Sequence, residues 1–197
     1  MTGRRERNRT RTHDALREAA LGRFARQGFD ATTVEQVADD ADVSVRTFFR
    51  YFPCKEAVLF GDEHRDAMLD VLRSRPADEP LVQSLRVMGE MGWHGGAATG
   101  EARRELRAEL MRTHPSIAGY AREQVAVAEL EVARIAADRL GVDPAVDLRP
   151  TVFAQLWGSL ARFSLERGAV GPDPVSVFDE WAAALGDLVG EVVPASR

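Results

Sequence analysis

Residues 33–41 have the pattern of a short helix with its own N-terminal cap. Thr33 is a favourable N-cap residue, and Gln36, three positions later, completes a capping box in which each side chain bonds the other residue's backbone. Apolar residues then recur at helical spacing from Val34 to Ala41. The sequence therefore predicts a short amphipathic helix directly after Thr33.

A second short helix follows almost at once. Asp42 starts a tight turn, and Ser44 is a second N-cap residue. Phe48 and Phe52, four positions apart, can bury one face of this helix, and Pro53 ends it. Two short helices joined in this way form a helix-turn-helix, whose second helix enters the major groove of DNA.

Two helices of this length cannot bury a core alone, so a supporting helix must lie nearby. Apolar residues from Ala15 to Phe24, followed by a helix-ending Gly28, supply it. The N-terminal part of the chain is thus predicted to be a three-helix DNA-binding domain.

Residues 10–60 resemble the DNA-binding domain of the TetR (tetracycline-repressor) family. Segments 23–33 and 43–59 keep the family's order, spacing and residue types. Three positions depart from it: Asp42 replaces the usual turn glycine, Phe49 a phosphate-binding tyrosine, and Cys54 a serine. Asp tolerates the left-handed conformation, whereas Phe49 cannot donate a hydroxyl hydrogen bond. The resemblance implies a fourth helix, starting near Lys55, that leads into a ligand-binding helical body.

The second helix of the motif is expected to read DNA with its N-terminal residues. Arg46 can pair with guanine through two hydrogen bonds, and Val45 can touch a thymine methyl group. The resemblance implies that Thr33, Thr47, Tyr51 and Lys55, the only lysine in the chain, hold the DNA backbone. The full predicted DNA-binding set is Thr33, Ser44, Val45, Arg46, Thr47, Phe49, Tyr51 and Lys55.

Positive charge is concentrated near the N-terminus, although the pI is about 5.5. Residues 1–55 hold 11 Lys and Arg against 8 Asp and Glu, and residues 56–197 hold 15 against 23. A disordered N-terminal arm that neutralises phosphates or enters the minor groove is the functional interpretation, and a solubilising terminus is the alternative. The arginines of this arm are Arg4, Arg5, Arg7, Arg9 and Arg11.

The rest of the chain also has helical patterns and no alternating strand pattern. The fourth helix is expected to run to Arg73–Pro76, because Pro76 ends it. Further helices are predicted over 79–93, 101–112, 115–140, 145–167 and 174–192. We therefore predict an all-α chain, with an N-terminal arm and helix-turn-helix domain over 1–54 and a helical effector-binding and dimerisation domain over 55–197.

Apolar residues of the last helix repeat at spacings of three and four, which suits packing against another helix. The helix before it has a stripe of its own, and ordinary packing within one chain is the alternative explanation. The resemblance implies that both helices pair with their copies in a homodimer. The predicted interface residues are Leu156, Leu160, Phe163, Phe178, Trp181, Leu185, Leu188 and Val192.

A small-molecule effector is implied by the resemblance. The segment 88–96 combines soft apolar groups, an indole and glycines, and an apolar or amphipathic effector suits it best. An arginine cluster at Arg103, Arg104 and Arg107 could meet a carboxylate, although a solvated helix face is the simpler explanation. Most residues of this kind are simply core, which is the alternative for each candidate ligand-binding residue: Met88, Met91, Trp93, Met111, Tyr120, Phe153 and Trp157.

Enzyme, metal and membrane functions find no support in the sequence. The four histidines lack metal-ligand spacing, Cys54 is the only cysteine, and no apolar run approaches the roughly 20 residues of a membrane span. We expect no cofactor and no metal. The resemblance implies a cytoplasmic repressor that a small ligand releases from a palindromic operator in double-stranded DNA. An effector-independent architectural DNA-binding protein is the alternative.

Overall fold

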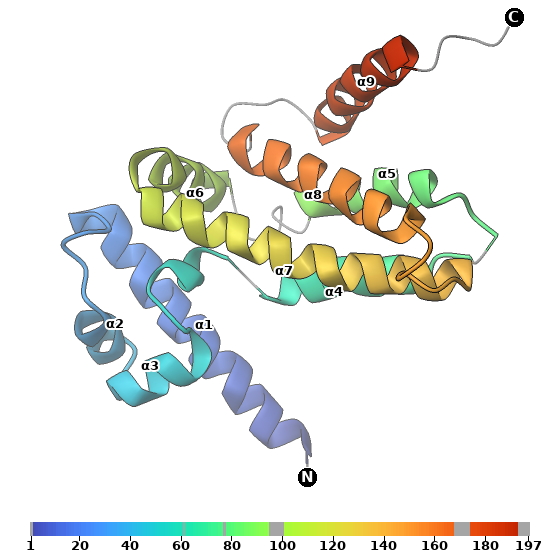
Figure 1. Cartoon of the computed structure of the whole chain (residues 1–197). Coiled ribbons are helices and arrows are strands. Elements are labelled where there is room, and N and C mark those ends of the chain that lie inside the picture. Colours follow the sequence, from blue (N-terminus) through green and yellow to red (C-terminus); the bar gives the residue numbers. More distant parts are fainter. Residues whose placement is uncertain (1, 61, 77, 95–100, 168–173, 193–197) are drawn as a thin grey trace, which may run out of the picture. The chain divides into compact units, whose positions relative to one another are not determined.

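The computed structural model describes residues 2–60, 62–76, 78–94, 101–167 and 174–192. Side chains at 2–6, 62–64, 89–94, 101, 102, 104, 166, 167, 174–177 and 188–192 lie outside this description. All regular structure in these ranges is helical, which confirms the all-α prediction (Figure 1). The elements are α1 (Thr2–Gln27), α2 (Val34–Asp40), α3 (Val45–Tyr51), the 3-10 turn η1 (Glu56–Leu59), α4 (Asp62–Ser74), α5 (Leu81–His94), α6 (Glu101–Thr113), α7 (Pro115–Leu140), α8 (Arg149–Arg167) and α9 (Pro174–Val192).

The chain forms two compact units. The first unit combines Met1–Gly61 with Leu110–Tyr120, the segment around the α6–α7 junction. The second unit combines Asp62–Glu109 with Ala121–Arg197. The first unit is therefore discontinuous in sequence. The functional boundary that we placed after residue 54 stays a prediction.

In the first unit, α1 supplies an apolar surface for α2 and for the segment that follows α3. Helix α1 contacts α2 and η1, and α2 contacts α3. Leu16 of α1, Val37 of α2 and Phe48 of α3 are fully buried. Arg17 is also buried, and its Nε donates a hydrogen bond to the carbonyl of Val58, 3.2 Å away. The supporting role predicted for the first helix is thus confirmed.

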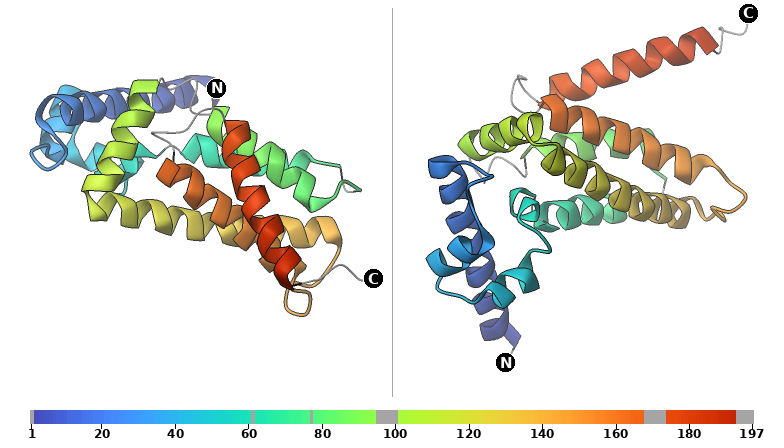
Figure 2. Two further views of the ribbon diagram at one scale, coloured as in Figure 1. Left: turned by 90° about the horizontal axis from the view of Figure 1, so that it is seen from above. Right: turned by 60° about the vertical axis from the view of Figure 1, so that its left-hand side comes forward.

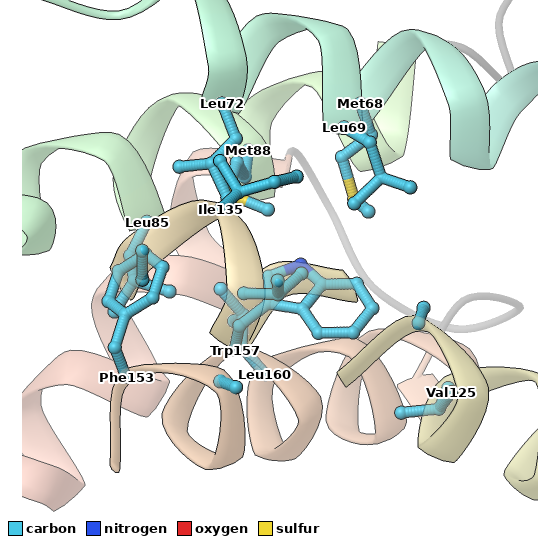
Figure 3. Close-up of a cluster of buried hydrophobic side chains, with 14 of the residues drawn as sticks. Met68, Leu69, Leu72, Leu85, Met88, Val125, Ile135, Phe153, Trp157 and Leu160 are labelled. Atoms are coloured by element: carbon cyan, nitrogen blue, oxygen red, sulfur yellow. The ribbon is translucent and has the colours of Figure 1, made fainter. Parts of the chain in front are cut away.

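The second unit has one apolar core, to which α4, α5, α7, α8 and α9 contribute. Helix α9 contacts both α5 and α8 (Figure 2). Leu72 of α4, Leu85 of α5 and Val132 of α7 are almost completely buried. Trp157 and Phe153 of α8 lie in the same cluster (Figure 3).

The predicted start of the fourth helix near Lys55 was wrong. Residues 56–59 form the 3-10 turn η1, and α4 begins only at Asp62. Between them Phe60 is extended, with φ −120° and ψ 124°. A residue in this conformation cannot continue a helix, so the link into the second unit is a turn followed by a new helix.

Two further boundaries differ from the prediction by more than two residues. The arm expected to be disordered belongs to α1, which begins at Thr2, because no proline interrupts the segment and each added residue extends an existing helix. Helix α8 begins at Arg149 rather than at 145. The carboxylate of Asp147 accepts a hydrogen bond from the Arg149 backbone N–H at 2.9 Å, and Pro150 in the first turn needs no acceptor. No α-helix in the described ranges is both long and apolar enough to cross a membrane.

Candidate DNA-binding surface

The capping box at the start of α2 is complete. Thr33 is extended, with φ −105° and ψ 159°, and its Oγ1 accepts a hydrogen bond from the Gln36 N–H at 3.3 Å. In return, the backbone N–H of Thr33 donates to Gln36 Oε1 at 3.1 Å. This reciprocal pair fixes where α2 begins.

The turn between the two helices depends on Asp42. Asp42 has φ +52°, and among the described residues it is the only one other than glycine with a positive φ. Its backbone N–H donates to Asp39 O at 3.1 Å, and the N–H of Val43 donates to Ala38 O at 3.0 Å. Aspartate therefore takes the left-handed conformation that glycine usually takes in such turns.

Ser44 caps α3 and fixes where the helix begins. Ser44 Oγ accepts from the Thr47 N–H at 3.1 Å, and the two hydroxyl oxygens are 2.9 Å apart. Phe48 points into the core, whereas Arg46 lies on the exposed face. The first turn of α3 thus presents a guanidinium to solvent from a helix anchored on its other side.

The aromatic residues of α3 divide between core and surface. Phe49 is 52% exposed, a high value for a phenyl ring, and its edge contacts the buried Phe48 ring. Tyr51 is partly buried, with the Arg50 guanidinium 5.2 Å from its ring centroid. Val45 and Thr47 are also partly buried. All predicted DNA-binding residues of α3 therefore keep some exposed surface.

Lys55 has partners within the chain. Its Nζ donates to the carbonyl oxygens of Phe29 at 2.7 Å and Thr32 at 2.8 Å. The same ammonium lies 4.0 Å from the centroid of the Phe29 ring. Its predicted contact with a phosphate remains a prediction.

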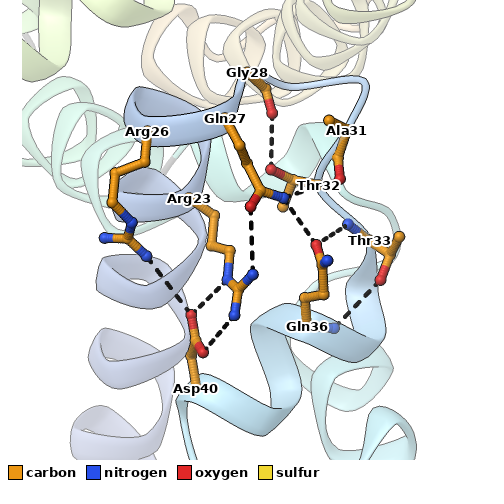
Figure 4. Close-up of polar contacts among 9 residues, drawn as sticks. All are labelled: Arg23, Arg26, Gln27, Gly28, Ala31, Thr32, Thr33, Gln36 and Asp40. Carbon is orange, nitrogen blue, oxygen red and sulfur yellow. Dashed lines mark hydrogen bonds and ion pairs between the residues drawn. The ribbon is translucent and has the colours of Figure 1, made fainter.

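An ion pair that sequence reasoning missed joins α1 to α2. Arg23 Nε and one terminal nitrogen donate to the two carboxylate oxygens of Asp40, each at 2.7 Å (Figure 4). These hydrogen bonds, ahead of opposing desolvation, lower the pKa of Asp40 and raise that of Arg23. The two residues are 17 positions apart, so no local spacing rule could have paired them.

Gln27 is a second residue that the sequence did not single out. Its Nε2 donates to Ala31 O and to Gln36 Oε1, both at 2.9 Å (Figure 4). The oxygen of Gln36 thus accepts from both Gln27 and the capping residue. The end of α1 is thereby tied to the first turn of α2.

The α6–α7 junction belongs to the same compact unit. His114 lies between the two helices, with Nε2 3.5 Å from Asp30 Oδ2. Its ring meets the Phe29 ring edge-on, with centroids 5.2 Å apart. Three residues later Ile117 is fully buried, and the Tyr120 ring lies 5.6 Å from that of Phe60. These contacts explain why 110–120 groups with the N-terminal helices.

The candidate ligand-binding residues fall into both units. Met88, Phe153 and Trp157 are buried together in the core of the second unit (Figure 3). Met111 and Tyr120 belong to the first unit. The side chains of Met91 and Trp93 lie outside the description.

The candidate dimer residues differ in exposure. Leu160 and Phe178 are buried in the core of their own chain. Trp181 packs against this core, and its Nε1 donates to Ser159 Oγ at 2.7 Å. Leu185 is partly exposed on α9. Leu156 and Phe163 are also partly exposed, and the side chains of Leu188 and Val192 lie outside the description.

Groups suited to metal or redox chemistry are sparse. In the part of the chain that the structure describes, no cluster of three or more His, Cys, Asp or Glu could hold a metal ion. Cys54 is half-buried and carries no disulfide, and burial raises the pKa of its thiol.

A capped recognition helix, braced by α1 and exposing an arginine at its start, defines a DNA-binding protein of the helix-turn-helix class. Residues 16–60 match the family model described as bacterial regulatory proteins of the tetR family. Residues 93–191 match a second model, the MftR C-terminal domain. The chain belongs to the TetR family of transcriptional regulators, as its sequence resemblance indicated, and the members it matches are regulators rather than enzymes.

Individual relatives extend this result along most of the chain. The HTH-type transcriptional regulator TcmR of Streptomyces glaucescens is 35% identical over 169 residues, which cover 81% of this chain and 74% of TcmR. Thermus thermophilus FadR, a TetR-family repressor solved with lauroyl-CoA, has a similar fold at 23% identity, with a TM-score of 0.51 over 94% of this chain and 99% of that one. Salmonella enterica GusR gives a TM-score of 0.52 at 20% identity, over 91% and 94% of the two chains.

Proposed function

We propose that this regulator is a cytoplasmic homodimeric repressor, released from a palindromic operator by a small apolar or amphipathic ligand. The observation that carries the proposal is the exposed Arg46 in the first turn of α3, a helix whose opposite face is fixed by Phe48. A recognition helix anchored in this way presents the same groups to the major groove each time it binds.

The DNA contacts that we propose fall into two classes. Arg46 and Val45 read base edges, and they decide which sequence is preferred. Thr33, Ser44, Thr47, Phe49 and Tyr51, together with the backbone at Lys55, lie along the phosphates and set the orientation of α3.

An apolar or amphipathic effector is supported by the core of the second unit. Met88, Phe153 and Trp157 combine a flexible thioether with two aromatic rings in one cluster. The structurally similar FadR of Thermus thermophilus was solved with lauroyl-CoA, an amphipathic acyl compound. We infer that this chain takes a ligand of comparable polarity, with an apolar part held beside Trp157.

Selection of duplexes from a random library, followed by a mobility-shift titration, tests the DNA-binding part of the proposal. We expect enrichment of a palindrome whose half-sites lie about one helical turn, roughly 34–36 Å, apart, because a two-fold dimer presents two equal recognition helices. Enrichment of a single half-site, or of no sequence at all, would contradict the proposal.

Lauroyl-CoA and free laurate are suitable first probes of the effector class. To lower the affinity for DNA 100-fold, a ligand must bind the DNA-free state more favourably than the DNA-bound state by about 2.7 kcal/mol. By reciprocity, the selected duplex must lower the affinity for the ligand 100-fold. Tryptophan fluorescence, with and without saturating duplex, measures both affinities. Equal ligand affinity in the two titrations would refute induction by that ligand.

A further inference from the structure

The ammonium of Lys55 bridges two parts of the DNA-binding unit. Lys55 directly precedes η1, beyond the end of α3, and its side chain reaches back to the loop between α1 and α2. There it donates to the carbonyls of Phe29 and Thr32, at 2.7 and 2.8 Å, and lies 4.0 Å from the Phe29 ring centroid. We call these three contacts the Lys55 bridge.

The bridge adds a donor to two carbonyls outside regular structure, and the Phe29 carbonyl also accepts the Thr32 N–H at 3.2 Å. The carbonyls of Phe29 and Thr32 lie between the last residue of α1 and the N-cap of α2, where no helical ladder of hydrogen bonds continues. An ammonium has three donors, and here two carbonyls and a ring face replace much of its hydration shell. Transferring this group to a DNA phosphate would break all three contacts and leave two carbonyls without this donor.

The position of the bridge connects it to DNA reading. Thr32 directly precedes Thr33, whose hydroxyl caps α2, and Lys55 lies four residues after Tyr51, the last residue of α3. The bridge therefore joins the start of the first motif helix to the segment that follows the second.

We propose that Lys55 is a positioning residue for DNA recognition, which holds the α1–α2 loop against the end of α3, and that its ammonium is not a phosphate ligand. The inference rests on the proposed DNA-binding function, although the bridge itself can be tested on protein without DNA.

Because Lys55 is the only lysine in the chain, amine acylation read by mass spectrometry reports on this side chain and the amino terminus alone. In DNA-free protein we expect Lys55 to react at least about tenfold more slowly than in urea-unfolded protein, since the bridge must open first. Addition of the selected duplex should slow the reaction by at most about another tenfold, because the closed bridge and DNA binding favour one another by the same factor. Full reactivity in folded protein, with protection only on DNA, would overturn the proposal.

Variants separate positioning from phosphate binding. Lys55→Met keeps the apolar stem and removes the donors, so affinity for the selected duplex should fall about tenfold while the slope of log affinity against log salt stays constant. Lys55→Arg should recover part of the affinity, because a guanidinium can also donate to two carbonyls. Arg50→Met is the matched control, removing one exposed positive charge from α3 without touching the loop.

A phosphate ligand predicts a different result. Loss of one ionic contact lowers the salt slope by about 0.9, and this change in Lys55→Met, or unchanged affinity, would refute a positioning role. If Lys55→Met does not fold, the acylation rates of the unmodified chain decide the question. Failure of the wild-type chain to bind any duplex would reject the proposed function, whereas slow acylation of Lys55 would still establish the bridge.

Discussion

In our proposal, Arg46 is the residue that recognises the base sequence of the operator. Arg46→Ala should lower affinity for the selected duplex by about 1–3 kcal/mol and affect random duplex much less, because a bidentate pair with guanine is lost. Arg50→Ala, on the same exposed face of α3, should weaken both duplexes more evenly. Mobility-shift titrations at one salt concentration measure the affinities of wild type and both variants for both duplexes. Equal losses on both duplexes for Arg46→Ala would remove its base-reading role.

The Arg23–Asp40 pair should contribute to stability in a pH-dependent way. Arg23 holds the pKa of Asp40 below its ordinary value. The contribution is therefore present above the unfolded pKa of about 3.9 and is lost as pH falls through the still lower folded pKa.

Arg23→Met should consequently be less stable than wild type at pH 7, and the difference should shrink as the pH falls below about 4. Urea unfolding followed by circular dichroism at pH 7 and pH 3 measures it. Arg122→Met, which removes an exposed arginine from α7, is the control and should track wild type at both values. A gap between Arg23→Met and wild type that is the same at both pH values would show that Asp40 titration is not involved.

At the scale of elements, the turn between α2 and α3 depends on one left-handed residue. Asp42→Ala should unfold with a free energy about 1 kcal/mol below that of Asp42→Gly, because alanine is strained at φ +52° and glycine is not. Asp39, inside α2, is the matched control. At position 39 the alanine variant should be the more stable of the two, since alanine stabilises a helix by up to about 1 kcal/mol relative to glycine. The same order at both positions in urea unfolding would contradict this account of the turn.

Residue types and short spacings in the sequence predicted these helices and their caps. They could not predict contacts between residues far apart in the sequence. Each cap acts within one turn of helix: the spacing of Thr33 and Gln36 predicted the first, and the residue type of Ser44 after the turn predicted the second. Lys55, by contrast, bonds carbonyls more than twenty residues away. No pattern in the sequence marks a backbone oxygen as an acceptor for a remote side chain. The end of η1 was missed for a similar reason, because Phe60 gives no local sign that its backbone is extended.

At the scale of the whole molecule, dimer formation through α8 and α9 is a prediction that single substitutions can test. Leu185→Glu should give monomers, because a charge would be buried without a partner at the proposed interface. Leu130→Glu is the control, since Leu130 on α7 is 75% exposed and should tolerate a charge. Sedimentation velocity measures both. A folded dimer for Leu185→Glu would place the interface elsewhere.

The contact of His114 with Phe29 and Asp30 has a consequence for how the protein is made. Residues 1–61 emerge from the ribosome before residues 110–120 do, and the segment between them takes roughly 2–10 s to synthesise. During that interval the nascent DNA-binding unit lacks the buried Ile117 and the imidazole that packs against the Phe29 ring. The same dependence applies to engineering, because a recognition head transplanted between relatives must carry its own α6–α7 junction with it.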